Sequence, residues 1–172
     1  MSEAVFQEVG PGAVDPKRGG KLAARWWKWA LSAPDDRSPV RDRTGKFAGW
    51  RQPSDVWFLA GTYGGRVVRR CQLPAGKPIF FPVFNTQRRA LGFSAQPWRV
   101  NASKAEAALN GTPLQVHEFA SRRFWAAGLP RVAWGFWCML DPLTPGQYVL
   151  SIKATSGGFW VDTTYHLEVV EP

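Results

Sequence analysis

The chain has 172 residues, of which 45% are hydrophobic and 20% charged, and its formal net charge is +9. This composition excludes a disordered chain, because it offers enough apolar surface for a core, and the length is most simply one domain. No N-terminal stretch resembles a signal peptide and no apolar run reaches membrane-span length, so we expect no transmembrane segment and a cytoplasmic location. Cys71 and Cys138 are too few for a disulfide framework; free thiols are the default, and one bridge stays open if their strands are neighbours.

The N-terminal region divides into an arm and a helix. Residues 1–16 are rich in Gly and Pro, which predicts a flexible arm, and residues 17–32 form a helix that Pro34 ends. At about 100° per residue, apolar side chains share one arc and basic ones lie opposite: Leu22, Ala23, Trp26, Trp27, Trp29 and Ala30 against Lys21, Arg25 and Lys28. Such a helix lies either on a membrane or on a sheet, and we favour the sheet because the remaining sequence provides one.

The middle of the chain predicts strands at 55–60, 66–73 and 78–85, separated by Gly-rich turns, with further strands near 113–119 and 131–140. The runs 56–59 and 79–84 are almost continuously apolar, which is typical of strands covered on both faces. Ser103 followed by Glu106 reads as a capping box and predicts a short helix over 103–109, with Gly111 just beyond its end.

The C-terminal segment is the most regular. Residues 148–153 and 159–169 alternate apolar and polar side chains with a period of two, which predicts two strands with one buried face each. The fold prediction is therefore mainly β: a single antiparallel β-sandwich or jelly-roll-like domain over 17–172, with an N-terminal amphipathic Trp-rich helix and one short helix.

Four segments carry a resemblance: Arg25-Trp-Trp-Lys-Trp-Ala-Leu-Ser32, Asp42-Arg-Thr-Gly45, Val56-Trp-Phe-Leu-Ala-Gly-Thr62 and Pro74-Ala-Gly-Lys-Pro-Ile-Phe-Phe-Pro-Val-Phe-Asn85. They resemble an uncharacterised family of bacterial proteins, many of them exported, with no assigned chemistry. The resemblance covers residues 22–85 and, more loosely, 135–170. It implies a Cys after the Asp-x-Thr-Gly turn that pairs with the Cys71 position. Phe47 stands at that place here, so the implied bridge is missing, which suggests an intracellular branch.

The positive charge is concentrated in the middle of the sequence, where residues 54–133 hold eleven Lys and Arg against three Asp and Glu. A cationic surface attracts nucleic acid, anionic lipid or acidic partners. Arg pairs 69–70, 88–89 and 122–123 would point to opposite faces on a strand, so one patch does not follow. Nucleic-acid binding stays an alternative that no reader motif supports.

Residues suited to catalysis are scarce. His117 and His166 are the only imidazole bases, and no Gly-x-Ser-x-Gly elbow or close pair of zinc ligands is present. We therefore expect no catalytic residues, no metal site and no cofactor, with a hydrolase of unknown substrate as the competing class.

Two loop dipeptides remain as candidate binding residues: Trp50-Arg51 and Trp98-Arg99, each an aromatic ring beside a guanidinium. Plugging the ends of the core is an equally good role for both Trp residues. The functional hypothesis is a non-enzymatic binding or assembly module that offers aromatic and basic surface to a carbohydrate, an acidic partner or copies of itself.

Overall fold

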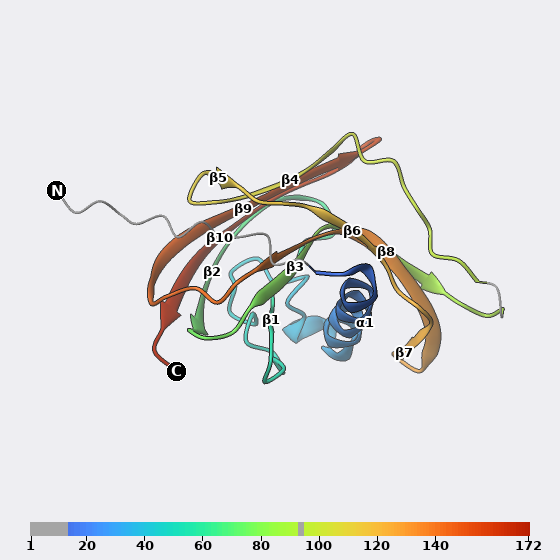
Figure 1. Ribbon diagram of the computed structural model, residues 1–172, viewed down its shortest axis with the longest axis horizontal. Helices are drawn as coiled ribbons and strands as arrows, with labels where there is room; N and C mark the ends of the chain where they lie inside the picture. The colour runs from blue at the N-terminus through green and yellow to red at the C-terminus, as the bar shows by residue number, and fades with distance from the viewer. Residues whose placement is uncertain (1–13, 93–94) are drawn as a thin grey trace.

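The structure is a computed structural model that describes residues 14–92 and 95–172. Within them the chain forms one α-helix, one short 3₁₀ helix and ten strands, in two sheets (Figure 1). The elements are α1 (Pro16–Ser32), η1 (Asp35–Arg37), β1 (Trp57–Phe58), β2 (Gly65–Pro74), β3 (Ile79–Arg89), β4 (Lys104–Leu109), β5 (Thr112–Pro113), β6 (His117–Ala120), β7 (Phe124–Ala126), β8 (Leu129–Leu140), β9 (Gly146–Ser156) and β10 (Phe159–Val170).

Helix α1 confirms the predicted N-terminal helix almost to the residue. Asp15 caps it by accepting a hydrogen bond from the Arg18 amide at 2.9 Å, and Pro16 occupies the first turn, where a missing N–H costs nothing. The chain leaves the helix at Ala33 in extended conformation, directly before Pro34. Most of the predicted 1–16 arm lies outside the described residues.

The strands divide into two mixed sheets. Sheet A has the order β1-β3-β8-β6, with β7 also paired to β8, and sheet B has the order β2-β10-β9-β4-β5. Most neighbours are antiparallel, but β1 runs parallel to β3 and β2 runs parallel to β10 along its whole length. The prediction of a wholly antiparallel protein is therefore wrong at these two pairs. Local alternation identifies a strand, but it does not say in which direction the strand's partner runs.

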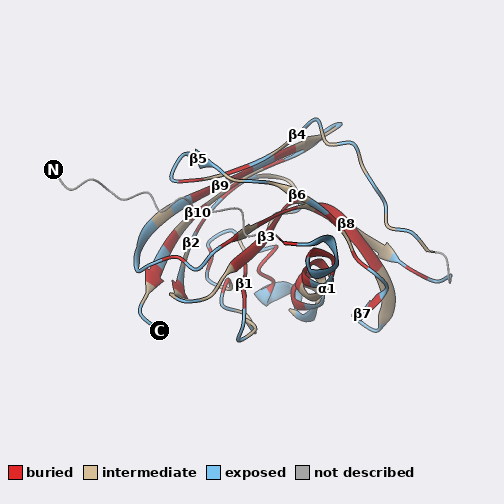
Figure 2. Cartoon of the chain, viewed as in Figure 1, coloured by how far each residue is buried: buried red, intermediate tan, exposed pale blue. Residues whose placement is uncertain are grey.

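Side chains from both sheets form the main core cluster. The inner faces, those turned toward the other sheet, contribute Phe81, Cys138 and Leu140 from sheet A and Leu150 and Leu167 from sheet B. A second cluster fills the space between α1 and the outer face of sheet A, where Trp rings of the helix pack on Phe58 and Trp137, and Phe80 stacks on Trp137. Figure 2 shows buried residues on the strands of both sheets and on the side of α1 that faces sheet A. The predicted packing of the helix on a sheet is confirmed.

The short helix predicted over 103–109 is wrong, because the segment forms β4. Lys104–Leu109 pairs with β9, and Ala107 and Leu109 are buried while Glu106 is exposed opposite Lys153. The capping-box pattern is a local preference, and the hydrogen bonds and core contacts offered by the edge of β9 outweigh it. Strand β7 was also missed, since three residues are too few for a periodic pattern.

Candidate functional site

The exposed face of α1 is uniformly basic. It carries Lys17, Arg18, Lys21, Arg25 and Lys28, and the helix contains no acidic residue. At 100° per residue these five side chains fall within an arc of about 100°, and the centre of this arc lies about 130° from Trp26, which packs on sheet A. We call these five residues the basic face of α1. Within the described residues only Arg25 of the five forms an ion pair.

A surface pocket of about 190 Å³ lies between α1 and the strand ends of sheet A. Arg18, Lys21 and Arg25 line it together with the apolar side chains of Leu22 and Met139, and Asp55 is its acidic residue. Arg25 donates hydrogen bonds from its Nη1 and Nη2 atoms to the two carboxylate oxygens of Asp55, at 3.0 Å and 2.6 Å. The hydrogen bond from Arg25 is the main reason that the pKa of Asp55 is lowered from its usual value.

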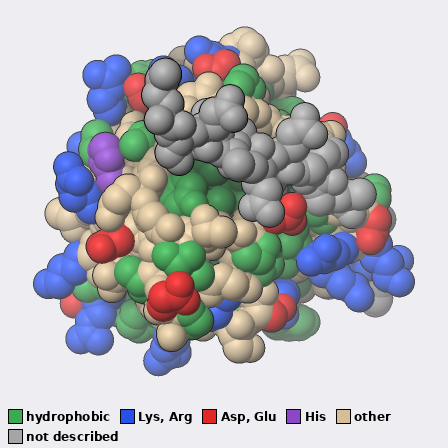
Figure 3. Space-filling view, turned by 60° about the vertical axis from the view of Figure 1, so that its left-hand side comes forward, with side chains coloured by type: hydrophobic (Ala, Val, Ile, Leu, Met, Phe, Trp, Pro, Cys, Tyr) green, Lys and Arg blue, Asp and Glu red, His purple; other side chains and the backbone are tan. Residues whose placement is uncertain are grey.

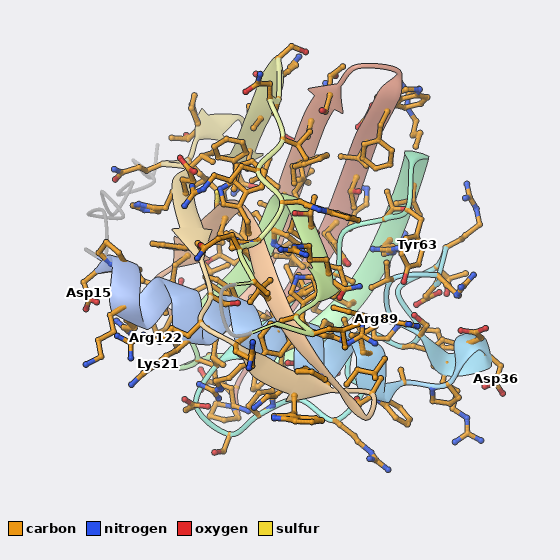
Figure 4. The ribbon with its side chains drawn as sticks, turned by 90° about the vertical axis from the view of Figure 1, so that its right-hand side faces the viewer. Asp15, Lys21, Asp36, Tyr63, Arg89 and Arg122 are labelled. Atoms are coloured by element: carbon orange, nitrogen blue, oxygen red, sulfur yellow. The ribbon has the colours of Figure 1, made fainter. Side chains whose placement is uncertain are left out.

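A further arginine, Arg122, lies near α1. Gly20 packs against the backbone of Ala120 and Ser121, where a Cβ atom would lie 2.5 Å from the Ala120 carbonyl oxygen. This close approach brings the exposed Arg122 to the N-terminal half of α1, and Figure 4 shows Lys21 and Arg122 beside each other. On the different face drawn in Figure 3, coloured Lys and Arg side chains lie around the periphery with Asp and Glu between them. The basic face of α1 and Arg122 therefore place several cations close together on this side of the molecule.

In the dipeptide Trp50-Arg51 the Trp packs against the helix and the Arg lies at the surface. Trp50 is half-buried against the helix cluster; its indole N–H donates to Ser32 Oγ at 3.1 Å, and its carbonyl oxygen accepts from the Trp29 indole at 2.5 Å. Arg51 stacks its guanidinium on the Trp50 ring, 5.0 Å from the centroid. Trp50 thus anchors the C-terminal end of α1 and leaves Arg51 as the exposed member of the pair.

Trp98-Arg99 is more exposed. The Trp98 side chain is 61% exposed, and its carbonyl oxygen accepts a hydrogen bond from Thr86 Oγ1. Arg99 binds Glu118, which also accepts from the Trp134 indole. Phe119 is buried against α1, on the outer face of sheet A. Glu118, its neighbour on β6, therefore points to the inner face, and Arg99 binds it there. The structure therefore does not bring the two predicted dipeptides together, because Trp50 lies on the outer face.

The Asp42–Gly45 motif covers an otherwise free strand edge. Thr44 O accepts a hydrogen bond from the Arg70 amide of β2, and Gly45 has φ +94°, with room for no Cβ against the Arg70 carbonyl. Burial of Asp42 by itself raises the pKa of its carboxyl, but hydrogen bonds from Phe47 and Thr44 outweigh burial, and the pKa is lowered overall.

Beneath this loop lies the buried Arg69, which is 1% exposed. Its guanidinium donates to the carbonyl oxygens of Val40, Asp42, Ala60 and Gly61 and to the Tyr165 hydroxyl, over 2.6–3.0 Å. Arg70 is exposed, so this Arg pair does point to opposite faces, as expected for a strand. Arg69 ties the loop to both sheets and is a structural residue.

The two histidines lie on different sheets. His166 lies on sheet B, whereas His117 lies on sheet A and stacks on Phe119. Burial raises the pKa of both the Cys71 and Cys138 thiols to about 12, and the two cysteines are free. Among the described residues no three His, Cys, Asp or Glu side chains are placed to hold a metal ion.

Comparison with known proteins found no family model that matches the chain and no curated protein that resembles it. In residues 14–92 and 95–172 there is no helix long and apolar enough to cross a membrane.

The basic face of α1 was not among the residues chosen from the sequence, although the clustering of Lys21, Arg25 and Lys28 was visible there. The signal that could have identified it is the lack of any acidic residue in the helix. Asp55, Pro78 and Met139, which complete the pocket, come from distant segments and leave no local pattern.

Proposed function

We propose that this protein is a non-enzymatic binding module that holds an acidic partner on the basic face of α1. The observation that carries the proposal is the run of five cations on one exposed helix face, of which four have no ion-pair partner among the described residues. Unpaired like charges repel one another, and an anionic partner relieves this repulsion while adding its own attraction.

The chemistry of the pocket favours carboxylate groups. Asp55 is a carboxylate already bound by Arg25 in the two-pronged geometry that suits a guanidinium. Arg18 and Lys21 line the same pocket and are the cations available to a second carboxylate. A partner segment rich in Asp or Glu therefore matches the site better than a neutral ligand does.

The other hypotheses have weaker support. Val68, Val149 and Trp160 are exposed on the outer face of sheet B, but polar and charged side chains separate them, which disfavours self-association there. A hydrolase has less support, because among the described residues neither His117 nor His166 forms a side-chain hydrogen bond to a Ser, Thr or Cys that could act as a nucleophile. Nucleic acid shares the required negative charge and is an outcome of the experiment below.

The test measures binding of poly-L-glutamate and of a 20-nucleotide oligothymidylate at about 50 mM and 300 mM salt. We expect poly-L-glutamate to bind at low salt and its affinity to fall as salt rises, because exposed charges are screened within about 10 Å at 0.1 M. The double variant Arg18→Gln/Lys21→Gln should bind about tenfold more weakly. The matched control Lys104→Gln/Lys153→Gln removes the same charge from the outer face of sheet B and should change little.

Equal losses in the two double variants would attribute binding to net charge alone and overturn the site. Tighter binding of oligothymidylate, with a steeper dependence on salt, would replace the acidic partner with nucleic acid. No binding to either polyanion at low salt would remove the proposed function.

Two finer assignments are also proposals. We class the two sheets as a jelly-roll-like β-sandwich, which the shared core supports and the two parallel pairs modify. We also place the chain with the bacterial family that it resembles: the Trp29, Phe58 and Phe80 rings of three resembling segments pack together, which accounts for their joint occurrence. The free cysteines agree with a cytoplasmic location.

A further inference from the structure

A second, smaller cavity lies at the edge of the main core, between β3 of sheet A and β10 of sheet B. Its volume is about 40 Å³, and Thr62, Phe84, Asn85, Phe159 and Thr163 are among the residues that line it. None of the described lining residues is charged, in contrast to the pocket beside α1. The two cavities therefore suit ligands of different chemistry.

The Thr163 side chain is the feature of this cavity that indicates a ligand. It is 0% exposed, and its Oγ1 atom has no hydrogen-bond partner among the described residues. Asn85 Nδ2 is a second buried polar atom on a lining residue without such a partner. Buried polar groups in native proteins are almost always hydrogen-bonded, so an unpartnered hydroxyl on a residue that lines a cavity points to a polar group that enters it when the side chain turns toward the cavity.

The opening of the cavity is aromatic. Phe159 lines the cavity and is also 39% exposed, so its ring lies where the cavity meets solvent. Phe84 packs edge-on against it, with ring centroids 5.8 Å apart. Tyr63, 60% exposed, follows the lining residue Thr62 and precedes Gly64, whose Cβ position would be 3.5 Å from the Phe159 ring. A ligand entering here passes over exposed aromatic surface.

We propose that this cavity binds a neutral hexopyranose, with the exocyclic hydroxymethyl group beside Thr163 and the C–H face of the sugar ring on Phe159. A volume of 40 Å³ is enough for a one-carbon alcohol and too little for a sugar ring. The hydroxymethyl group supplies the donor and acceptor that Thr163 Oγ1 lacks. This ligand is independent of the acidic partner and of the basic face of α1.

Methyl glucoside and methyl xyloside form the matched pair of probes, because the xyloside lacks only the hydroxymethyl group. In calorimetric titrations we expect the glucoside to bind at least about tenfold more tightly, since a site built around a hydroxyl discriminates against an analogue without it. Thr163→Val and Phe159→Ala should each weaken glucoside binding by about the same factor. Thr164→Val, at the next position on β10 and on the outer face, is the control and should bind like the wild type.

Melting curves without sugar separate ligand binding from stability. The melting temperature of Thr163→Val should equal or exceed that of the wild type, because the lost hydroxyl has no partner to lose. A marked drop would show that the hydroxyl is structural and would overturn the assignment. Absence of glucoside binding, equal affinity for glucoside and xyloside, or unchanged binding by Thr163→Val would each overturn it as well.

Discussion

The two sheets differ in how they are covered, although their longest strands, β8 and β10, are equal at 12 residues. Sheet A has the other sheet on its inner face and α1 on its outer face, so Phe80 and Trp137 are buried on the outer side. Sheet B packs on one side only, and its outer face exposes Val68 and Trp160. The burial of β10 alternates along its length, whereas that of β8 is nearly continuous.

This difference explains which parts of the chain tolerate change. In sheet A a side chain on either face fills space between packed layers, so its loss leaves a cavity. In sheet B every second residue faces solvent, where a substitution removes few contacts. The helix side of sheet A should therefore respond much more strongly to substitution than the outer face of sheet B.

The largest expected effect is that of Trp26→Ala. Trp26 is 2% exposed, contacts Trp137 edge-on and donates its indole N–H to Leu59 O at 2.9 Å. Its removal should lower the free energy of unfolding by about 3–5 kcal/mol, measured by urea denaturation. Trp160→Ala, on the outer face of sheet B, should cost under about 1 kcal/mol. Similar losses in the two variants would contradict the comparison between the sheets.

Sheet B also contains a buried charged residue at which a large effect is expected, Arg69 on its edge strand β2. Arg69→Met removes the donor for four carbonyl oxygens and the Tyr165 hydroxyl, and should destabilise by about 2–4 kcal/mol. Arg66→Met, on the exposed face of the same strand, breaks only a solvent-exposed ion pair with Asp162 and should cost under about 1 kcal/mol. Chemical denaturation of both variants tests the ratio; a mild Arg69→Met would mean that water replaces the lost donor.

The contact between α1 and sheet A is tested by Gly19→Ala. A Cβ atom at Gly19 would lie 2.3 Å from the Phe119 ring, which is itself buried. The overlap should outweigh the gain in helix propensity and destabilise by about 1–2 kcal/mol in thermal denaturation. Gly158→Ala, in the open turn before β10, has nothing within 4 Å and should stay within about 0.5 kcal/mol of the wild type. A stabilised Gly19→Ala would show that the helix can shift on the sheet.

A smaller effect is expected at alkaline pH from Cys138 in β8. Burial raises the pKa of this thiol from 9.0 to about 12, so between these values the unfolded chain loses the proton and the folded chain keeps it. Stability from this group is therefore complete below pH 9 and falls by about 1.4 kcal/mol per pH unit above it. Unfolding free energies at pH 8 and pH 10 should differ by about 1.4 kcal/mol more in the wild type than in Cys138→Ala. Equal differences would mean that the thiol ionises in the folded protein.

The candidate binding residues chosen from the sequence illustrate the limit of local reasoning. Trp50 and Trp98 were equivalent as Trp-Arg loop dipeptides, yet one anchors α1 and the other is exposed on the opposite face of sheet A. Whether a loop Trp is buried depends on what packs against it, and that information lies elsewhere in the chain. The basic face of α1, in contrast, can be found from helix periodicity, because all of its residues belong to one helix.

The elements that can be predicted from the sequence are those whose signals are local. The boundaries of α1 follow from Asp15, Pro16 and Pro34, and the strands β9 and β10 follow from a period-two alternation longer than any turn could produce. Three features depend on long-range contacts: residues 104–109 pair with β9, β2 runs parallel to β10, and Arg69 is buried beneath the Asp42–Gly45 loop. In each of these cases the deciding energy comes from hydrogen bonds and contacts between residues far apart in the chain, which no local pattern records.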